Sequence, residues 1–223
     1  MPAALGAPRP GCYAREMRVA ILTFDGFNEL DSFIALGLIN KLRPRGVMAE
    51  LCGPNNPLVS MNGVAVAPQQ PLEFALEADA VLIGSGLYTR ALAENGALMD
   101  RLALDPTRQL IGAQCSGTLL LARLGLLGDM PACTDATTRP WVVEAGVRVS
   151  DRPFLARGPI ATAGGCMASV YLATWVLWHA AGRSAARQAL HEVAPVGEKD
   201  AWADHALTVV GACLADDVLS PAE

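Results

Sequence analysis

The chain alternates between short, almost wholly apolar runs and longer segments in which apolar residues recur at helical spacing. Four apolar runs are typical of strands buried on both faces of a parallel sheet, at 18–24, 47–52, 80–83 and 109–114. Helical spacing occupies 29–43, 90–103, 118–126, 167–181, 184–192 and 201–214. Because strands alternate with helices, the pattern predicts an α/β protein with a mostly parallel sheet that helices cover on both faces.

Shorter patterns predict smaller elements between these. Residues 58–66 fit a hairpin that turns at Asn62-Gly63, and 72–77 fit one or two helical turns. We expect further short strands at 132–134, 147–150, 154–157 and 160–163, and a short helix at 141–146. Residues 1–16 are rich in Pro, Gly and Ala without an apolar repeat, so we expect a flexible N-terminal extension before a single domain over 17–223.

The junction between the strand at 109–114 and the following helix carries the clearest chemical signal. Cys115 stands where the strand pattern ends, and the helical pattern begins within three residues. This order predicts a nucleophile elbow, in which the reactive residue occupies a sharp turn between a strand and a helix. The helix N-terminus would favour the thiolate of Cys115, and the N–H of Ser116 would supply half of an oxyanion hole. A buried structural cysteine is the alternative interpretation.

Small-residue corners follow the other strands as well. They are Asp25-Gly26, Gly84-Ser85-Gly86 and Gly164-Gly165. Because chemistry collects outside the carboxyl ends of parallel strands, we expect these corners to meet the Cys115 elbow at one edge of the sheet. The backbone at Ser85 and Gly86 could add oxyanion-hole donors there, and Gly165 and Cys166 could line the pocket or simply pack.

A cysteine nucleophile usually needs a proton donor or acceptor close by. The histidines, His179, His191 and His205, all fall in late helical segments and offer no obvious partner. Asp31, near the end of the first strand, is better placed, and partial burial would raise its pKa so that a protonated carboxyl could hydrogen-bond a thiolate. The alternative role for Asp31 is an ordinary first-turn acid of a helix.

Asp135 is a second acidic candidate for the pocket. It follows the expected strand at 132–134, and a helix cap for the turn after it is the favoured interpretation. Four larger side chains could also face the mouth of the pocket: Phe27, Tyr88, Arg139 and Trp141.

Composition narrows the function classes. Hydrophobic residues make up 52% and charged residues 17%, which allows a large core, and the net charge of −5 disfavours nucleic acid as a partner. No apolar run reaches the roughly 20 residues that a membrane-spanning helix needs, so no membrane partner is expected. The six cysteines form no CxxC pair and no zinc-like spacing with the three histidines. We therefore expect reduced thiols in a cytoplasmic protein, with no metal and no cofactor.

Taken together in order, several segments resemble the DJ-1/PfpI superfamily, and within it the branch that includes isonitrile hydratases. The resemblance runs from Arg18 to about Pro195. It is carried by 19–31, 83–86, 114–122, 125–127, 132–135 and 162–165. It implies a flavodoxin-like three-layer sandwich, a homodimer, and an elbow cysteine, Cys115, that faces an acid from the first helix, Asp31. The hydratases carry Thr after the cysteine, and Ser116 keeps that hydroxyl.

Three segments depart from the pattern of the family. Gly84-Ser85-Gly86 stands where the family commonly has Pro-Gly-Gly, and Asp135 stands where it often has His. Residues 30–35 replace the Leu-Asp-Leu-Thr-Gly-Pro string that is typical of the hydratases.

The resemblance implies a cofactor-independent, cysteine-dependent hydratase or lyase that acts on a small molecule. The leading expectation is conversion of an isonitrile to an N-formamide, with Cys115 attacking carbon while Asp31 positions water and handles protons. Two alternatives stay open: a glyoxalase- or amidase-like enzyme for a small carbonyl compound, and a non-enzymatic sensor in which Cys115 is oxidised or binds a ligand.

Overall fold

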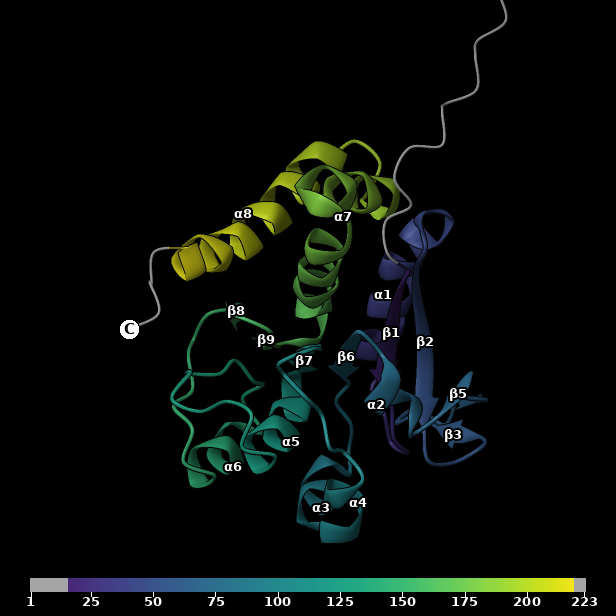
Figure 1. Ribbon diagram of the computed structural model, residues 1–223, viewed down its shortest axis with the longest axis vertical. Coiled ribbons are helices and arrows are strands. Elements are labelled where there is room, and N and C mark those ends of the chain that lie inside the picture. The colour runs from purple at the N-terminus through teal and green to yellow at the C-terminus, as the bar shows by residue number, and fades with distance from the viewer. Residues whose placement is uncertain (1–15, 219–223) are drawn as a thin grey trace, which may run out of the picture.

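A seven-stranded, mostly parallel sheet organises the chain (Figure 1). The computed structural model describes residues 16–218, so the N-terminal extension expected over 1–16 lies almost wholly outside it. The strand order is β5-β2-β1-β6-β7-β9-β8, and only β8 runs antiparallel to its neighbour. The bounds are β1 Met17–Leu22, β2 Val47–Gly53, β5 Gln70–Pro71, β6 Ala80–Ile83, β7 Leu110–Gln114, β8 Phe154–Arg157 and β9 Ile160–Ala163.

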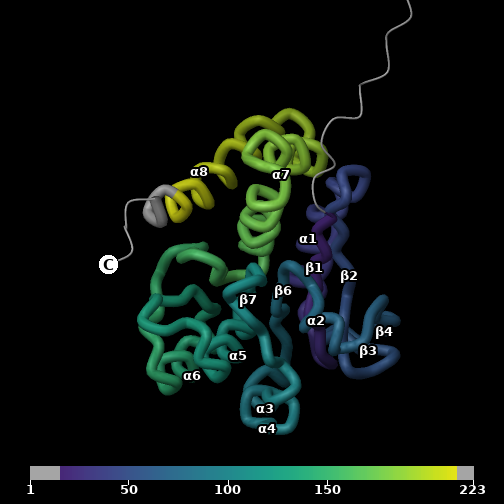
Figure 2. Tube along the Cα trace, viewed as in Figure 1, coloured from purple at the N-terminus to yellow at the C-terminus, as the bar shows by residue number. Residues whose placement is uncertain are grey.

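Alternation along the central strands divides the apolar residues between two cores, one on each face of the sheet. Val19 and Ile21 of β1 pack with α1 (Glu29–Ile39), α7 (Ser169–Val193) and α8 (Lys199–Val218). Ala20 and Leu22 pack on the other face, with α2 (Phe74–Glu77), α3 (Thr89–Glu94), α4 (Gly96–Asp100), α5 (Thr118–Arg123) and α6 (Arg139–Glu144). The predicted α/β fold, a flavodoxin-like three-layer sandwich, is confirmed, and Figure 2 traces the chain through it.

The smaller elements agree with the sequence pattern at several points. β3 (Leu58–Val59) and β4 (Ala65–Val66) form the expected antiparallel hairpin, and β8 and β9 form another.

None of the helices in the described part of the chain is long and apolar enough to cross a membrane.

Two predicted helices are shorter than expected because polar side chains end them. The helix expected over 90–103 breaks at Asn95, whose side chain accepts the N–H of Leu98 and so caps a separate α4. The helix expected over 29–43 ends at Ile39 and continues as the 3-10 helix η1 (Asn40–Arg45). There the Asn40 side chain bonds both backbone groups of Ala49 on β2. A third helix, expected over 118–126, ends at Arg123 and is followed by a turn.

The strands predicted at 132–134 and 147–150 are wrong. Only one isolated bridge, between Ala132 and Val149, joins them. Cys133 does not join the sheet because side chains occupy its backbone: its N–H donates to Thr162 Oγ1 at 2.9 Å, and its carbonyl accepts from Thr118 Oγ1 at 2.8 Å. The two-residue strand β5 was not predicted, because Pro71 and its short length hide it from the pattern.

The helical patterns at 167–181 and 184–192 form α7, interrupted where the sequence leaves a gap between them. Gly182 adopts φ 81° and ψ 167°, a backbone conformation that is essentially restricted to glycine. This break bends the chain inside α7, and α8 contacts both parts: Tyr171 lies beside His205, and Arg187 pairs with Asp204.

Gly182→Ala should therefore lower the free energy of unfolding by about 1–3 kcal/mol, because alanine is strained at this conformation. Gly37→Ala is the matched control. Gly37 lies inside α1 with open space around its missing Cβ, so alanine there should be neutral or stabilise the protein by up to about 1 kcal/mol. Urea denaturation of both variants measures the difference, and equal effects would contradict this account of the break.

Candidate active site

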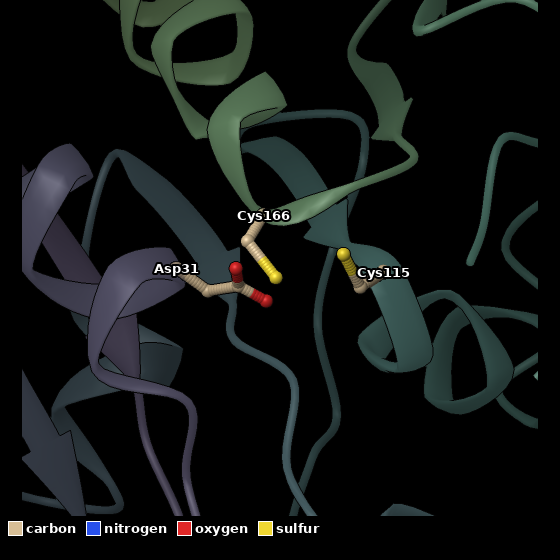
Figure 3. Close-up of side chains that lie close together, drawn as sticks. All are labelled: Asp31, Cys115 and Cys166. Carbon is tan, nitrogen blue, oxygen red and sulfur yellow. The ribbon is translucent and has the colours of Figure 1, made fainter. Parts of the chain in front are cut away.

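Three side chains converge at the carboxyl edge of the sheet, from segments far apart in sequence (Figure 3). Asp31 comes from the first turn of α1, Cys115 from the end of β7, and Cys166 from the 3-10 helix η3 (Cys166–Ala168) that follows β9. The two sulfur atoms and the nearest carboxyl oxygen all lie within 4.8 Å of one another. The expectation that Asp31 faces the elbow is met in geometry, and Cys166 belongs to the same cluster.

The elbow at Cys115 is sharply bent. Its φ is 46°, the only positive φ at a non-glycine residue in the described part of the chain, and the 3-10 helix η2 (Cys115–Gly117) leads directly into α5. The Thr134 hydroxyl donates to the Cys115 carbonyl at 2.8 Å. Gly117 allows the turn to lie against β6, since a Cβ there would stand 2.7 Å from the carbonyl oxygens of Ile83 and Gly84.

The Asp31 carboxyl is buried without a hydrogen-bond partner. Its side chain is 3% exposed, and neither oxygen accepts a hydrogen bond of normal geometry from the described residues. Burial raises the pKa of Asp31 to about 6, while the nearby hydroxyl of Ser85 and the thiols of Cys166 and Cys115 partly oppose that rise. These three groups lie close enough to interact with the carboxyl. The predicted rise in the pKa of Asp31 is confirmed.

The Cys115 thiol does not have the lowered pKa that its position at a helix start suggested. Burial raises the pKa of Cys115 above its ordinary range, and the negative charge of Asp31 raises it further. The Gln114 amide nitrogen, 3.5 Å from the sulfur, works in the opposite direction. The thiol is 3% exposed, so loss of water outweighs the dipole effect on which the sequence argument rested. Burial and the neighbouring Asp31 carboxyl therefore both favour the neutral thiol of Cys115 over its thiolate.

The Gly84-Ser85-Gly86 corner meets the elbow through a side chain. Gly86 N–H donates to Ser116 Oγ at 3.2 Å, and Thr89 Oγ1 lies 2.8 Å from the same oxygen. The Ser116 hydroxyl accepts the N–H of Gly86 in this structure, and a role for Gly86 as an oxyanion-hole donor stays a prediction. The N–H of Ser116 lies in the first helical turn, where no intrahelical acceptor exists. Ser85 lies beside the Asp31 carboxyl, and its role as a donor stays a prediction.

Two amide side chains organise the site, and the sequence analysis did not identify either of them. Asn28 accepts the N–H of Leu30, which caps α1, and its amide nitrogen donates to Cys166 Sγ at 3.1 Å. Gln114 donates to the Gly165 carbonyl at 2.7 Å and so ties β7 to the corner before η3. The signals were present in the sequence: an Asn at a helix start, and a lone Gln at the end of an apolar strand.

Asp135 acts as the cap that was the favoured interpretation. Its carboxyl accepts the N–H groups of Thr137 and Thr138 at 2.9 and 3.0 Å. Its charge still reaches the site, where it raises the pKa of both Asp31 and Cys115.

The side chains suggested for the pocket mouth mostly lie elsewhere. Phe27 is 1% exposed and packs edge-on against Phe33, so it lines no pocket. Arg139 pairs with Asp151, and Trp141 lies under the Arg90 guanidinium, while Tyr88 is exposed.

An apolar groove of about 730 Å³ begins at Cys166 instead. Its lining includes Gly165, Met167, Tyr171, Trp202 and His205. His205 Nε2 lies 3.1 Å from the Tyr171 hydroxyl. None of the three histidines belongs to the Asp31, Cys115 and Cys166 cluster.

Comparisons with known proteins agree with this architecture. A model of the DJ-1/PfpI family matches residues 17–178, which is most of the chain, and the protein belongs to this family. No curated protein sequence matches the chain.

Solved structures share the fold at low sequence identity. Schizosaccharomyces pombe DJ-1 is 16% identical, with a TM-score of 0.69, over 80% of this chain and 99% of its own. A THiJ/PfpI family protein from Pseudomonas syringae is 16% identical, with a TM-score of 0.70, over 92% of this chain and 98% of its own. A mutant DJ-1 superfamily protein from Salmonella typhimurium is 22% identical, with a TM-score of 0.68, over 80% of this chain and 99% of its own.

The hydrogen bond from Thr134 to the Cys115 carbonyl supports the bent elbow, and its loss should be measurable. Thr134→Val keeps the shape but removes the hydroxyl, so we expect the free energy of unfolding to fall by about 1–3 kcal/mol. Thr134→Ser retains a hydroxyl and should lose less. Chemical denaturation compares the two variants, and a larger loss in Thr134→Ser than in Thr134→Val would show that packing of the Thr134 methyl, rather than its hydroxyl, supports the elbow.

Proposed function

We propose that this protein is a cysteine-dependent hydratase that converts small isonitriles to N-formamides without a cofactor. The observation that carries the proposal is the buried, unpartnered Asp31 carboxyl beside the Cys115 sulfur at a strained elbow. A carboxylate in that place can take the thiol proton as the sulfur forms a bond, so the site needs no preformed thiolate and no histidine.

The first step is addition of Cys115 to the terminal carbon of R–N≡C. The sulfur forms a bond to that carbon while Asp31 accepts the thiol proton. Asp31 then delivers the same proton to the carbon, which leaves a thioimidate, R–N=CH–S–Cys115. The N–H of Ser116, in the first turn after the cysteine, would stabilise charge that develops there.

Water completes the reaction in the second step. Asp31, again a carboxylate, removes a proton from water as its oxygen attacks the thioimidate carbon. The tetrahedral intermediate collapses with cleavage of the carbon–sulfur bond, the nitrogen takes up a proton, and Cys115 returns to the thiol. The net change is addition of one water to the isonitrile, with no oxidation and no leaving group.

The surroundings of the cluster support an apolar small-molecule substrate. The groove meets the cluster at Cys166, while Asp31 and Cys115 do not line it. It is lined mainly by apolar side chains and has room for an aryl or alkyl group. No lysine or arginine lines it, so an anionic substrate would find no cationic partner among its described residues. A glyoxalase- or amidase-like activity through Cys115 would need the same thiol, and a panel of small carbonyl compounds separates those activities from hydration.

Cys115→Ala should abolish formamide formation from an aryl isonitrile, because no other thiol in the described part of the chain lies at the elbow. Asp31→Asn should lower kcat by about 100-fold or more, the usual contribution of a positioned acid–base group. Formamide formation is followed by chromatography.

Cys52→Ala is the matched control for this measurement. It removes a buried thiol on β2, outside the cluster, and should leave turnover unchanged. Full activity in Cys115→Ala would contradict the nucleophile assignment, and full activity in Asp31→Asn would contradict the proton-transfer role.

A cysteine-based sensor is the second candidate, and the closeness of Cys166 to Cys115 favours it. Exposure to hydrogen peroxide followed by intact-mass measurement separates the two functions. A sensor should add oxygen or lose two hydrogens at Cys115 and change its behaviour, whereas the hydratase proposal requires only that the reduced protein turn over.

We further propose that the protein forms a homodimer, as its family resemblance implies. The exposed apolar side chain of Leu30 on α1, which is 49% exposed and lies outside the groove, supports this. Cytoplasmic location also stays a proposal, which rests on the reduced thiols that the chemistry requires.

A further inference from the structure

The Asp31, Cys115 and Cys166 side chains present three ligand atoms of a kind that metals bind. Two are sulfur atoms and one is a carboxyl oxygen, and Figure 3 shows all three side chains directed toward a common space. They come from α1, the elbow and η3, at positions 31, 115 and 166. Because the sequence separation is large and irregular, no ligand spacing reveals this group in the sequence, where no metal site was expected.

The Asp31 carboxyl supplies an independent sign of a missing ligand. Asp31 is 3% exposed, yet both of its carboxyl oxygens lack a hydrogen-bond partner of normal geometry among the described residues. Buried carboxylates are normally paired with a cation or fully hydrogen-bonded. The described salt bridges include none to Asp31.

The spacing of the three atoms suits a small tetrahedral ion. Zinc bound by two sulfurs and one carboxylate oxygen places its ligand atoms about 3.3–3.8 Å apart, given bond lengths of about 2.0–2.3 Å. The observed upper limit of 4.8 Å requires closure of about 1 Å, which side-chain rotation can supply. Asn28, whose amide donates to Cys166 Sγ, already orients one of the ligands, as groups behind metal ligands commonly do.

The chemical types of the three ligand atoms determine which cations the site favours. Calcium and magnesium prefer oxygen ligands, whereas two thiolates with one carboxylate favour zinc and other thiophilic ions. Three protein ligands leave the fourth tetrahedral position open to water or another small ligand, the pattern of exchangeable zinc sites. Cys166 is half-buried at the end of the apolar groove, which provides an entry path.

We propose that Asp31, Cys115 and Cys166 form a three-ligand binding site for Zn²⁺ with an open fourth position. Binding converts both thiols to thiolates and releases their protons to solvent, with no oxidation or reduction. The ion would occupy the Cys115 sulfur and the Asp31 carboxyl together. The proposal does not require Cys115 to be catalytic, and if the hydratase proposal also holds, zinc inhibits the enzyme.

Metal binding is tested on the reduced, chelator-treated protein in the absence of any isonitrile. All proteins carry Cys12→Ser, so that a thiol outside the described residues cannot contribute. Competition with a chromophoric chelator measures Zn²⁺ affinity and stoichiometry, and Co²⁺ spectra report thiolate ligands through their charge-transfer bands. We expect one Zn²⁺ per chain, a tetrahedral thiolate spectrum with Co²⁺, and a higher Tm when Zn²⁺ is added.

Cys166→Ser and Asp31→Asn each remove one ligand. Both should weaken Zn²⁺ binding by more than the roughly 10- to 100-fold that loss of a ligand-orienting residue costs. Cys52→Ala is the thiol control and should bind as the parent protein does, since Cys52 is buried on β2 outside the cluster. Absence of a Co²⁺–thiolate band in the parent protein, or parental affinity in Cys166→Ser, would overturn the proposal. The cobalt spectrum needs no variant, so a misfolded variant leaves the test intact.

Discussion

The bent backbone at Cys115 is the constraint on which the rest of the site depends. A φ of 46° at a residue with a Cβ costs of order 1–3 kcal/mol, and the surroundings must hold it. Thr134 bonds the Cys115 carbonyl, and Gly117 lets the helix start lie directly on the carbonyls of β6. As a result the sulfur leaves the line of β7 and lies at the carboxyl edge of the sheet, close to Asp31 and Cys166.

Burial then determines the chemistry of that edge. It raises the pKa of both Asp31 and Cys115, and the charge of Asp31 raises the pKa of Cys115 further. The pair therefore holds one negative charge far more easily than two. A site of this kind works by moving a proton between carboxyl and thiol during bond formation, or by accepting a cation that relieves the repulsion. The proposed hydration and the proposed zinc binding are two consequences of the same buried acid beside the same sulfur.

The spacing of apolar residues predicted the helices and strands whose formation depends on burial in the core. The short apolar runs located the buried strands β1 and β6, and the strand-to-helix change around Cys115 located the elbow. Asp31 could be identified because it follows the first parallel strand closely, which places it near the carboxyl edge of the sheet.

The spacing of apolar residues did not predict the features that depend on hydrogen bonds made by side chains. Asn95 ends a helix, Thr162 and Thr118 keep Cys133 out of the sheet, and Asn28 reaches Cys166 across 138 positions. The pKa of Cys115 could not be predicted from the sequence either. A helix start lowers this pKa, but burial raises it more, and only the fold determines burial. These contacts are set by three-dimensional packing and leave no repeating trace along the chain.

The most direct test of the central claim is to capture the covalent state of Cys115 during turnover. The wild-type protein is mixed with an aryl isonitrile, quenched in acid within the first turnover, and examined by intact-mass and peptide mapping. The account predicts an adduct equal to the full mass of the isonitrile, on the peptide that contains Cys115, decaying as formamide appears. An adduct on a different cysteine, or formamide released with no adduct on Cys115, would contradict it.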